Sequence, residues 1–140
     1  MATACIPQVS FEFQGLRQSV VARFDQPHAS SDGGALLLKA VDDRLGVTER
    51  LAGSLRDPRQ PGKIDHELIE LVRQRVFGLA CGYADCNDAA RLADDAIHKL
   101  LLDRDPIAGP ALASQPTLSR FENAVTWAPL RDMAHVLTNT

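Results

Sequence analysis

The strongest constraint on the fold is the apolar periodicity of the segment HELIELVRQRVFGLACG, residues 66–82. Its apolar side chains follow the i, i+3, i+4, i+8 spacing of a helix that buries one face. These side chains are Leu68, Leu71, Val72, Val76, Leu79 and Ala80. Asp65 precedes them as a candidate N-cap, and Gly82 follows them as a stop. The pattern predicts a central core helix that the rest of the chain packs against.

Helical periodicity begins again upstream, near residue 33. Residues 30–32 (Ser-Ser-Asp) offer N-cap oxygens to a helix over about 33–45, and Gly46 stands at its C′ position. The predicted buried face of this helix consists of Leu36, Leu37, Val41 and Leu45. A short helix is expected from Thr48, and the prolines and glycine of RDPRQPGK then predict a loop.

Downstream of the core helix, residues 83–106 predict one or two short helices, with Asn87 or Asp88 as a plausible cap. The segment GPALASQP predicts a second loop. Pro116, at a first helical position, opens the helix PTLSRFENAV, and Ser114 is its candidate N-cap. A last helix is expected within WAPLRDMAHVLTNT, after Ala128 and Pro129.

The first 30 residues differ from the rest of the chain. In FEFQGLRQSVVARFD, two short runs rich in Phe and Val flank Gly15 and partly alternate apolar with polar residues. This pattern indicates two short strands or a loose hairpin. The predicted fold class is therefore mostly α: a helical bundle-like domain with a short N-terminal β-hairpin or strand pair. We expect an N-terminal strand region over 1–29 and a helical domain over 30–140.

Composition narrows the classes of function. A chain of 140 residues that is 45% hydrophobic and 24% charged is expected to form one globular domain. It contains no apolar run of about 18 residues, no secretory signal pattern and an odd number of cysteines, so we expect a cytoplasmic protein with no membrane partner. The net charge of −3 excludes a chain that is basic throughout, so nucleic-acid binding would have to rest on local basic faces.

Catalytic and metal-binding patterns are weak in this sequence. Cys81 and Cys86 have no second Cys or His pair at metal-ligand spacing, so they are interpreted as small buried hydrophobic residues and no metal site is expected. A thiol nucleophile at Cys86, near a predicted helix start, is the weaker alternative. The acidic pairs 42–43 and 94–95 are interpreted as solvated faces or helix ends, and Asp32 as a helix cap.

Two segments carry residues suited to DNA. The polar start of the helix after residue 114 resembles a recognition helix, with Leu118 and Phe121 facing inward, although an ordinary amphipathic helix gives the same pattern. The candidate base or phosphate contacts are Gln115, Thr117, Ser119 and Arg120. The candidate backbone contacts are Arg56, Arg59, Lys63, Arg73 and Arg75. For Arg73 and Arg75, complementarity to the C-terminal helix dipole is an equally good explanation.

Three runs, in this order, resemble the N-terminal region of group 1 DDE-domain transposases of bacterial insertion sequences. They are SSDGGALLLKAVDDRLGVTERLA (30–52), IDHELIELVRQRVFGLACGYADCNDAARLADD (64–95) and LASQPTLSRFEN (112–123). The resemblance implies a role in DNA transposition, DNA at the element's terminal inverted repeats as partner, and a second copy or an intact transposase as a further partner. It also implies a bacterial cytoplasmic protein that associates with the nucleoid when bound to DNA.

The resemblance further implies that catalysis resides elsewhere. Members of the family cut and join DNA with three carboxylates that hold two divalent ions, expected to be Mg²⁺, in an RNase-H-like core. Their first catalytic aspartate follows the helix that resembles PTLSRFEN. This chain is therefore expected to be truncated before the catalytic core, to be inactive alone and to need no cofactor of its own. None of Asp32, Asp42, Asp43, Asp94 and Asp95 is expected to be catalytic.

Two other interpretations stay open at this stage. The acidic balance of residues 76–105 also suits a helical protein–protein assembly module without DNA contacts of its own. A non-functional transposase remnant is the third possibility, and it would show no cooperative thermal unfolding.

Overall fold

The computed structural model describes residues 9–11, 20–22 and 29–138, and these are mostly helical, which confirms the predicted class. The first helices are α1 (Ala35–Leu45), α2 (Val47–Gly53) and α3 (Leu68–Ala80). A 3-10 turn, η1 (Cys86–Asp88), leads into α4 (Ala89–Leu92) and α5 (Ala96–Leu101). The last two helices are α6 (Gln115–Ala124) and α7 (Trp127–Thr138).

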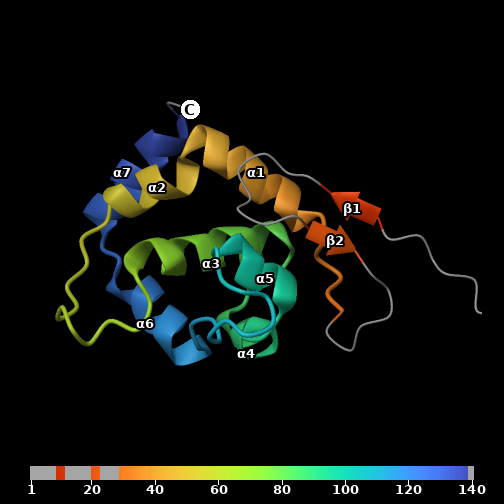
Figure 1. Ribbon diagram of the computed structural model, residues 1–140. Coiled ribbons are helices and arrows are strands. Elements are labelled where there is room, and N and C mark those ends of the chain that lie inside the picture. The colour runs from red at the N-terminus through yellow and green to blue at the C-terminus, as the bar shows by residue number, and fades with distance from the viewer. Residues whose placement is uncertain (1–8, 12–19, 23–28, 139–140) are drawn as a thin grey trace, which may run out of the picture.

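Helix α3 lies at the centre of the domain. It contacts α1, α2, α5 and α6, so that α1 and α2 cover one side and α4 and α6 lie on the other (Figure 1). One buried cluster joins α3 to α1 and α5 through Phe77, Leu36 and Leu101. A second cluster joins α3 to α4 and α6 through Leu71, Ala89 and Leu118. The core therefore has two parts, one on each side of the same helix.

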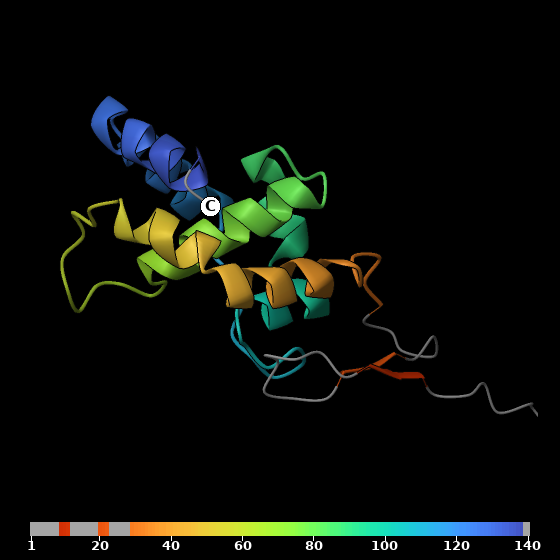
Figure 2. The ribbon, with the colours of Figure 1, turned by 90° about the horizontal axis from the view of Figure 1, so that it is seen from above.

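Two short strands precede the helices. Strand β1 (Val9–Phe11) pairs antiparallel with β2 (Val20–Ala22), with Ser10 opposite Val21. In Figure 2 the pair lies beyond the start of α1, to one side of the helices. The connection over residues 12–19, which would decide between a hairpin and a looser strand pair, lies outside the described residues, as do residues 23–28 of the predicted strand region.

The predicted buried face of α1 is wrong at three of its four positions. Leu36 is buried, but Leu37, Val41 and Leu45 are each more than half exposed. Lys39 and Asp42 are buried on this helix instead. Both are satisfied inside the fold, because the ammonium of Lys39 lies 3.0 Å from Asp103 Oδ1 and Asp42 Oδ1 accepts a hydrogen bond from Thr48 N. The helix therefore packs its more polar side inward.

The central helix departs from its predicted pattern in a similar way. Leu71 and Val72 are buried as expected, but Leu79 is 52% exposed and Ala80 is exposed. Phe77 and Gln74 lie inside the fold in their place. The buried face of α3 is therefore rotated from the predicted one, toward α5 and α6.

Two predicted caps are corrected by the structure, and a third is confirmed in its position. The N-cap of α1 is Gly34, because the Asp32 carboxylate contacts His98 instead of capping the helix. The N-cap of α3 is Glu67, whose backbone N–H donates to the side chain of Glu70, and not Asp65. Asp88 is the N-cap residue of α4, as predicted, although its side chain makes no capping hydrogen bond, and Asp85 caps the preceding turn η1.

Other predicted boundaries are confirmed. Gly46 ends α1 with a φ of 64°, in the left-handed region that favours glycine. Ser114 is the N-cap residue of α6, and Pro116 lies in its first turn. Asp95 caps α5 by accepting from His98 N, as expected for a helix-ending role of this acidic pair. Every helix in the described part of the chain is too short or too polar to span a bilayer.

Candidate nucleic-acid interface

The start of α6 is fixed from below by the central helix. The carboxamide of Gln74 donates to Ala113 O at 2.9 Å and accepts from Ala113 N at 3.0 Å. Gln74 and Ala113 are both almost fully buried, so these two hydrogen bonds are shielded from water. Leu118, 2% exposed, inserts into the core one turn later, as predicted. Together these contacts set both the position and the rotation of α6.

An open groove of about 470 Å³ lies between η1 and the first two turns of α6. Its lining consists of Ala84, Asp85, Cys86, Asn87, Gln115, Ser119 and Glu122. Gln115 and Ser119 are two of the four residues predicted to contact DNA from this helix. The structure therefore brings half of that set to one concave, polar surface.

The walls of this groove are held together by Arg75. Its guanidinium pairs with Glu122 on α6 and also donates to the backbone carbonyls of Tyr83 and Ala84. The side chain is only 14% exposed. Arg75 thus links α3, α6 and the segment before η1, which gives it a structural task in addition to the predicted DNA contact.

Cys86 lies in the same groove and donates a hydrogen bond to Glu122 Oε2 at 3.0 Å. Burial, and next the contact with the Glu122 carboxylate, raise the pKa of this thiol. The neutral thiol is therefore favoured over the thiolate that a nucleophile needs. Cys86 is thus partly exposed in the groove, and not the buried hydrophobic residue that the sequence predicted, and its environment disfavours a nucleophilic thiolate.

The two other predicted residues of α6 differ in their surroundings. The Thr117 hydroxyl lies 3.1 Å from the Ser114 hydroxyl, within the first turn of the helix. Arg120 is exposed, and no hydrogen bond or ion pair joins its guanidinium to the described residues. Of the four predicted residues, Arg120 is thus the one with a charge still available to a phosphate.

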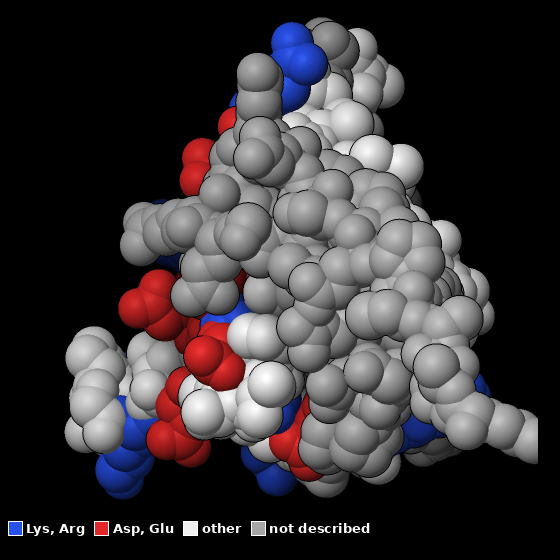
Figure 3. Space-filling model, turned by 45° about the vertical axis from the view of Figure 1, so that its right-hand side comes forward, with Lys and Arg blue, Asp and Glu red and all other residues white. Residues whose placement is uncertain are grey.

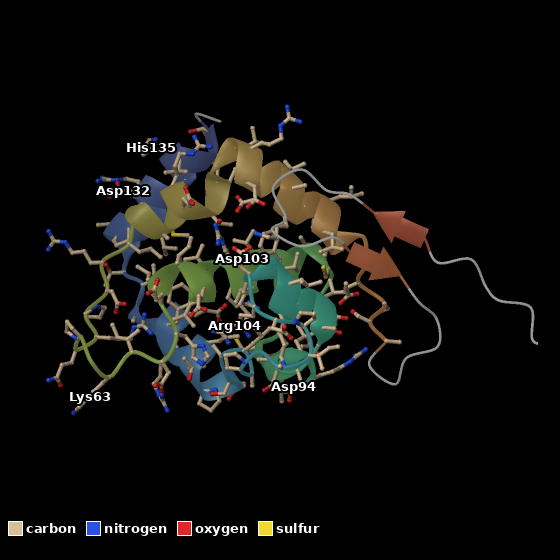
Figure 4. The ribbon with its side chains drawn as sticks, in the orientation of Figure 1. Lys63, Asp94, Asp103, Arg104, Asp132 and His135 are labelled. Carbon is tan, nitrogen blue, oxygen red and sulfur yellow. The ribbon has the colours of Figure 1, made fainter. Side chains whose placement is uncertain are left out.

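The loop between α2 and α3, residues 54–67, extends away from the helices at the end opposite the strands (Figure 2). Arg56 and Lys63 are exposed on it, without a side-chain partner among the described residues, and Figure 4 shows Lys63 at the outer edge of the loop. Arg59 instead forms an ion pair with Asp57 and donates to His66 O at 2.8 Å. Its hydrogen bond to Asp57 lowers the pKa of that carboxyl.

Arg73 lies inside an ionic network between α1, α2, α3 and the turn after α5. Its guanidinium is 3.3 Å from Asp103 Oδ2 and 3.7 Å from Glu49 Oε1, and it donates to Thr48 Oγ1. Figure 4 places Asp103 between α1 and the helices below it. The side chain of Arg73 is 16% exposed, so most of its hydrogen-bonding capacity is used within the domain.

Charge on the described surface is mixed. On the face in Figure 3, acidic and basic side chains alternate along the edge of the described part, and no broad basic patch forms there among the described residues. A DNA contact on the described part of this face would therefore rest on single exposed cations and polar side chains. Such isolated cations are consistent with the net charge of −3, which excludes a chain that is basic throughout.

Two functional candidates were not predicted from the sequence. Asn87 lines the groove opposite Gln115, and its side chain donates to Asp85 Oδ2 at 2.9 Å. The second candidate is a grouping of Asp32, Cys81 and His98, whose ligand atoms all lie within 4.8 Å of one another. Sequence spacing could not reveal this grouping, because its members are far apart along the chain.

The Asp32, Cys81 and His98 grouping does not fit the paired Mg²⁺ ions of a DDE catalytic core. Such ions prefer carboxylate and water oxygens, whereas this grouping offers a thiol and an imidazole beside a single carboxylate. The grouping therefore does not supply the metal chemistry of strand transfer.

The family model described as transposase DDE domain group 1 matches residues 13–139. The match spans the described helices from α1 to α7. The chain belongs to this family, as the resemblance indicated. No curated protein and no solved structure matches it.

Proposed function

We propose that this chain binds DNA as part of a DDE transposase, and that it contacts the element's terminal inverted repeats. The observation that carries the proposal is the polar groove at the start of α6, lined by Gln115, Ser119 and Asn87. Membership of the family supports a transposase-related role in general. The cytoplasm, and the nucleoid when DNA is bound, would be the place of action.

The chemistry of the groove suits base edges better than phosphates. Side-chain amides such as those of Gln115 and Asn87 form paired hydrogen bonds with adenine, and a serine hydroxyl pairs with several bases. Asp85 and Glu122 also line the groove, and their carboxylates repel a phosphate. We therefore assign base contacts to the groove and phosphate contacts to its surroundings.

The predicted phosphate contacts fall into two groups. Arg120, Arg56 and Lys63 are exposed without a partner among the described residues, so binding a phosphate breaks no internal ion pair. Arg59 and Arg75 are already paired with carboxylates, and so is Arg73. In the proposal the first group contributes more to the salt dependence of binding than the second.

Fluorescence anisotropy with a set of single variants tests this assignment on a duplex selected from a random library by the full chain. Gln115→Ala should weaken binding by about 1–3 kcal/mol, the value of one paired hydrogen bond to a base, and should relax the base preference. Arg120→Ala should weaken binding to all duplexes and lower the log–log salt slope by about 0.9. Arg44→Ala, exposed on α1 across the central helix from α6, serves as the matched control. If the parent protein and the three variants bound the duplex equally well, α6 would not be part of the DNA interface.

A second candidate function is assembly with another copy of the chain, without DNA contacts. One observation favours it: Leu37, Val41 and Leu45 repeat every four residues on α1 and are 60%, 53% and 51% exposed. Exposed apolar residues on one helix face are typical of interaction surfaces. A sedimentation coefficient that rises with protein concentration, with no shift in anisotropy for any duplex, would favour assembly over DNA binding.

A further inference from the structure

Three side chains of types that can ligate a metal meet where α3 ends beside α5 and the entry to α1. Asp32 precedes α1, Cys81 follows the last residue of α3, and His98 lies in α5. One ligand atom from each residue lies within 4.8 Å of the others. The cluster therefore joins three separate elements of the domain at one point.

The imidazole of His98 is fully buried in this cluster, with 0% exposure. Its Nε2 lies 3.0 Å from Asp32 Oδ2, whereas its Nδ1 has no hydrogen-bond partner among the described residues. The ring of Tyr83 packs against it edge-on, with the ring centroids 5.6 Å apart. Because Nε2 is the nitrogen that faces the Asp32 carboxylate, it is the ring atom placed to ligate an ion together with Asp32.

The donor set is chemically selective. A thiolate, an imidazole and a carboxylate are the ligands that Zn²⁺ accepts, whereas Mg²⁺ and Ca²⁺ prefer oxygen alone. Bond lengths of about 2.0–2.3 Å in a tetrahedral site place ligand atoms roughly 3.3–3.8 Å from each other. The atoms in the cluster are already within 4.8 Å, so closing on an ion takes a movement of about 1 Å.

The charge balance also suits a divalent cation. Asp32 and a deprotonated Cys81 supply two negative charges, and His98 is neutral when it ligates a metal. The ion and its ligands would then be neutral together in a largely buried place. A buried charge without such compensation would be costly.

We propose that Asp32, Cys81 and His98 form a Zn²⁺-binding site that clips the entry to α1 and the end of α3 to α5. Binding displaces the proton of the Cys81 thiol to solvent, and water completes the fourth position. The site acts on the stability of the domain and takes no part in DNA strand chemistry. It is independent of the proposed base contacts in the groove.

The test uses the full chain, reduced with a phosphine and stripped of metal. Titration with Co²⁺ should produce a thiolate-to-cobalt charge-transfer band and tetrahedral d–d bands that saturate at one ion per chain. Added Zn²⁺ should abolish these bands and raise the midpoint of thermal unfolding. Cys81→Ser should remove the charge-transfer band and weaken Zn²⁺ binding by more than the 10–100-fold typical of lost second-shell contacts. Cys86→Ser is the matched control and should behave as the parent protein.

Two results would overturn the site. One is a folded parent protein that shows no charge-transfer band with Co²⁺. The other is an unchanged band in Cys81→Ser, or its loss in Cys86→Ser. If Cys81→Ser does not fold, alkylation of the parent protein decides the question: Zn²⁺ should slow the modification of Cys81 at least tenfold and leave the rate at Cys86 unchanged. Equal rates at Cys81 with and without Zn²⁺ would refute the site.

Discussion

The contact between Gln74 and Ala113 provides the sharpest test of how the domain positions α6. The carboxamide of Gln74 makes two hydrogen bonds to one backbone unit, and both residues are at most 4% exposed. Gln74→Met keeps the length and approximate volume of the side chain but removes both bonds. The backbone N–H and C=O of Ala113 would then be buried without partners.

The expected cost follows from these two groups. A buried backbone group left unsatisfied costs about 1–3 kcal/mol, so two cost roughly 2–6 kcal/mol. The better burial of a thioether than of an amide offsets part of this, which leaves about 2–4 kcal/mol. Because a domain of this size is stable by only about 5–15 kcal/mol, the loss is large. At about 3 °C per kcal/mol, the midpoint of thermal unfolding should fall by about 6–12 °C.

Urea unfolding followed by far-ultraviolet circular dichroism measures this loss. The m-value should stay unchanged, since the variant exposes the same surface on unfolding. Gln60→Met, an exposed substitution of the same type, is the control and should change the free energy of unfolding by less than about 0.5 kcal/mol. If Gln74→Met also lost less than about 0.5 kcal/mol, the two hydrogen bonds would not be what positions α6.

Three further predictions concern stability. Leu36→Ala should cost about 2–4 kcal/mol in urea unfolding and Leu37→Ala less than about 0.5, because only Leu36 is buried; equal costs would contradict the observed orientation of α1. Gly46→Ala should cost about 1 kcal/mol in the same assay, since the φ of 64° disfavours a side chain although nothing within 3.4 Å blocks a Cβ; a neutral effect would contradict it. Burial, and next the charge of Arg104, lower the pKa of His66, so the unfolded state binds the proton more strongly. Stability should therefore fall as the pH drops below about 6.5. His66→Gln should reduce the change in the urea midpoint between about pH 7.5 and 5.5. The same pH dependence of the midpoint in both proteins would refute this.

The helices of this domain could be predicted from the sequence because their ends carry local signals. Gly46 ends α1, and Ser114 with Pro116 begins α6, where the sequence placed them. These signals act within a few residues and need no tertiary information. The mostly helical class followed from the same evidence.

The orientation of α1 could not be predicted, because it depends on partners that are distant along the chain. Lys39 is buried since Asp103, beyond α5, neutralises it. Asp42 is buried since Thr48 supplies donors from the next helix. Apolar periodicity alone places Leu37 and Val41 in the core. It cannot predict that polar side chains are buried instead, because their charges and hydrogen bonds are satisfied by other elements.

The candidate sites show the same division. Gln115 and Ser119 were accessible to sequence reasoning because they share one short segment. Asn87 was not, since η1 reaches the groove only through the packing of α4 and η1 against α6. The Asp32, Cys81 and His98 grouping was missed for the same reason, because only the fold brings its three elements together.

The central claim is that this chain recognises the ends of a mobile element. Fluorescence anisotropy on a labelled duplex of the flanking inverted repeat, with a scrambled duplex of equal length and composition alongside, tests it most directly at two salt concentrations. We predict tighter binding to the repeat at both salts, with affinity for both duplexes falling as salt rises. Equal affinity for the two duplexes, or no binding by protein that unfolds cooperatively, would contradict the claim.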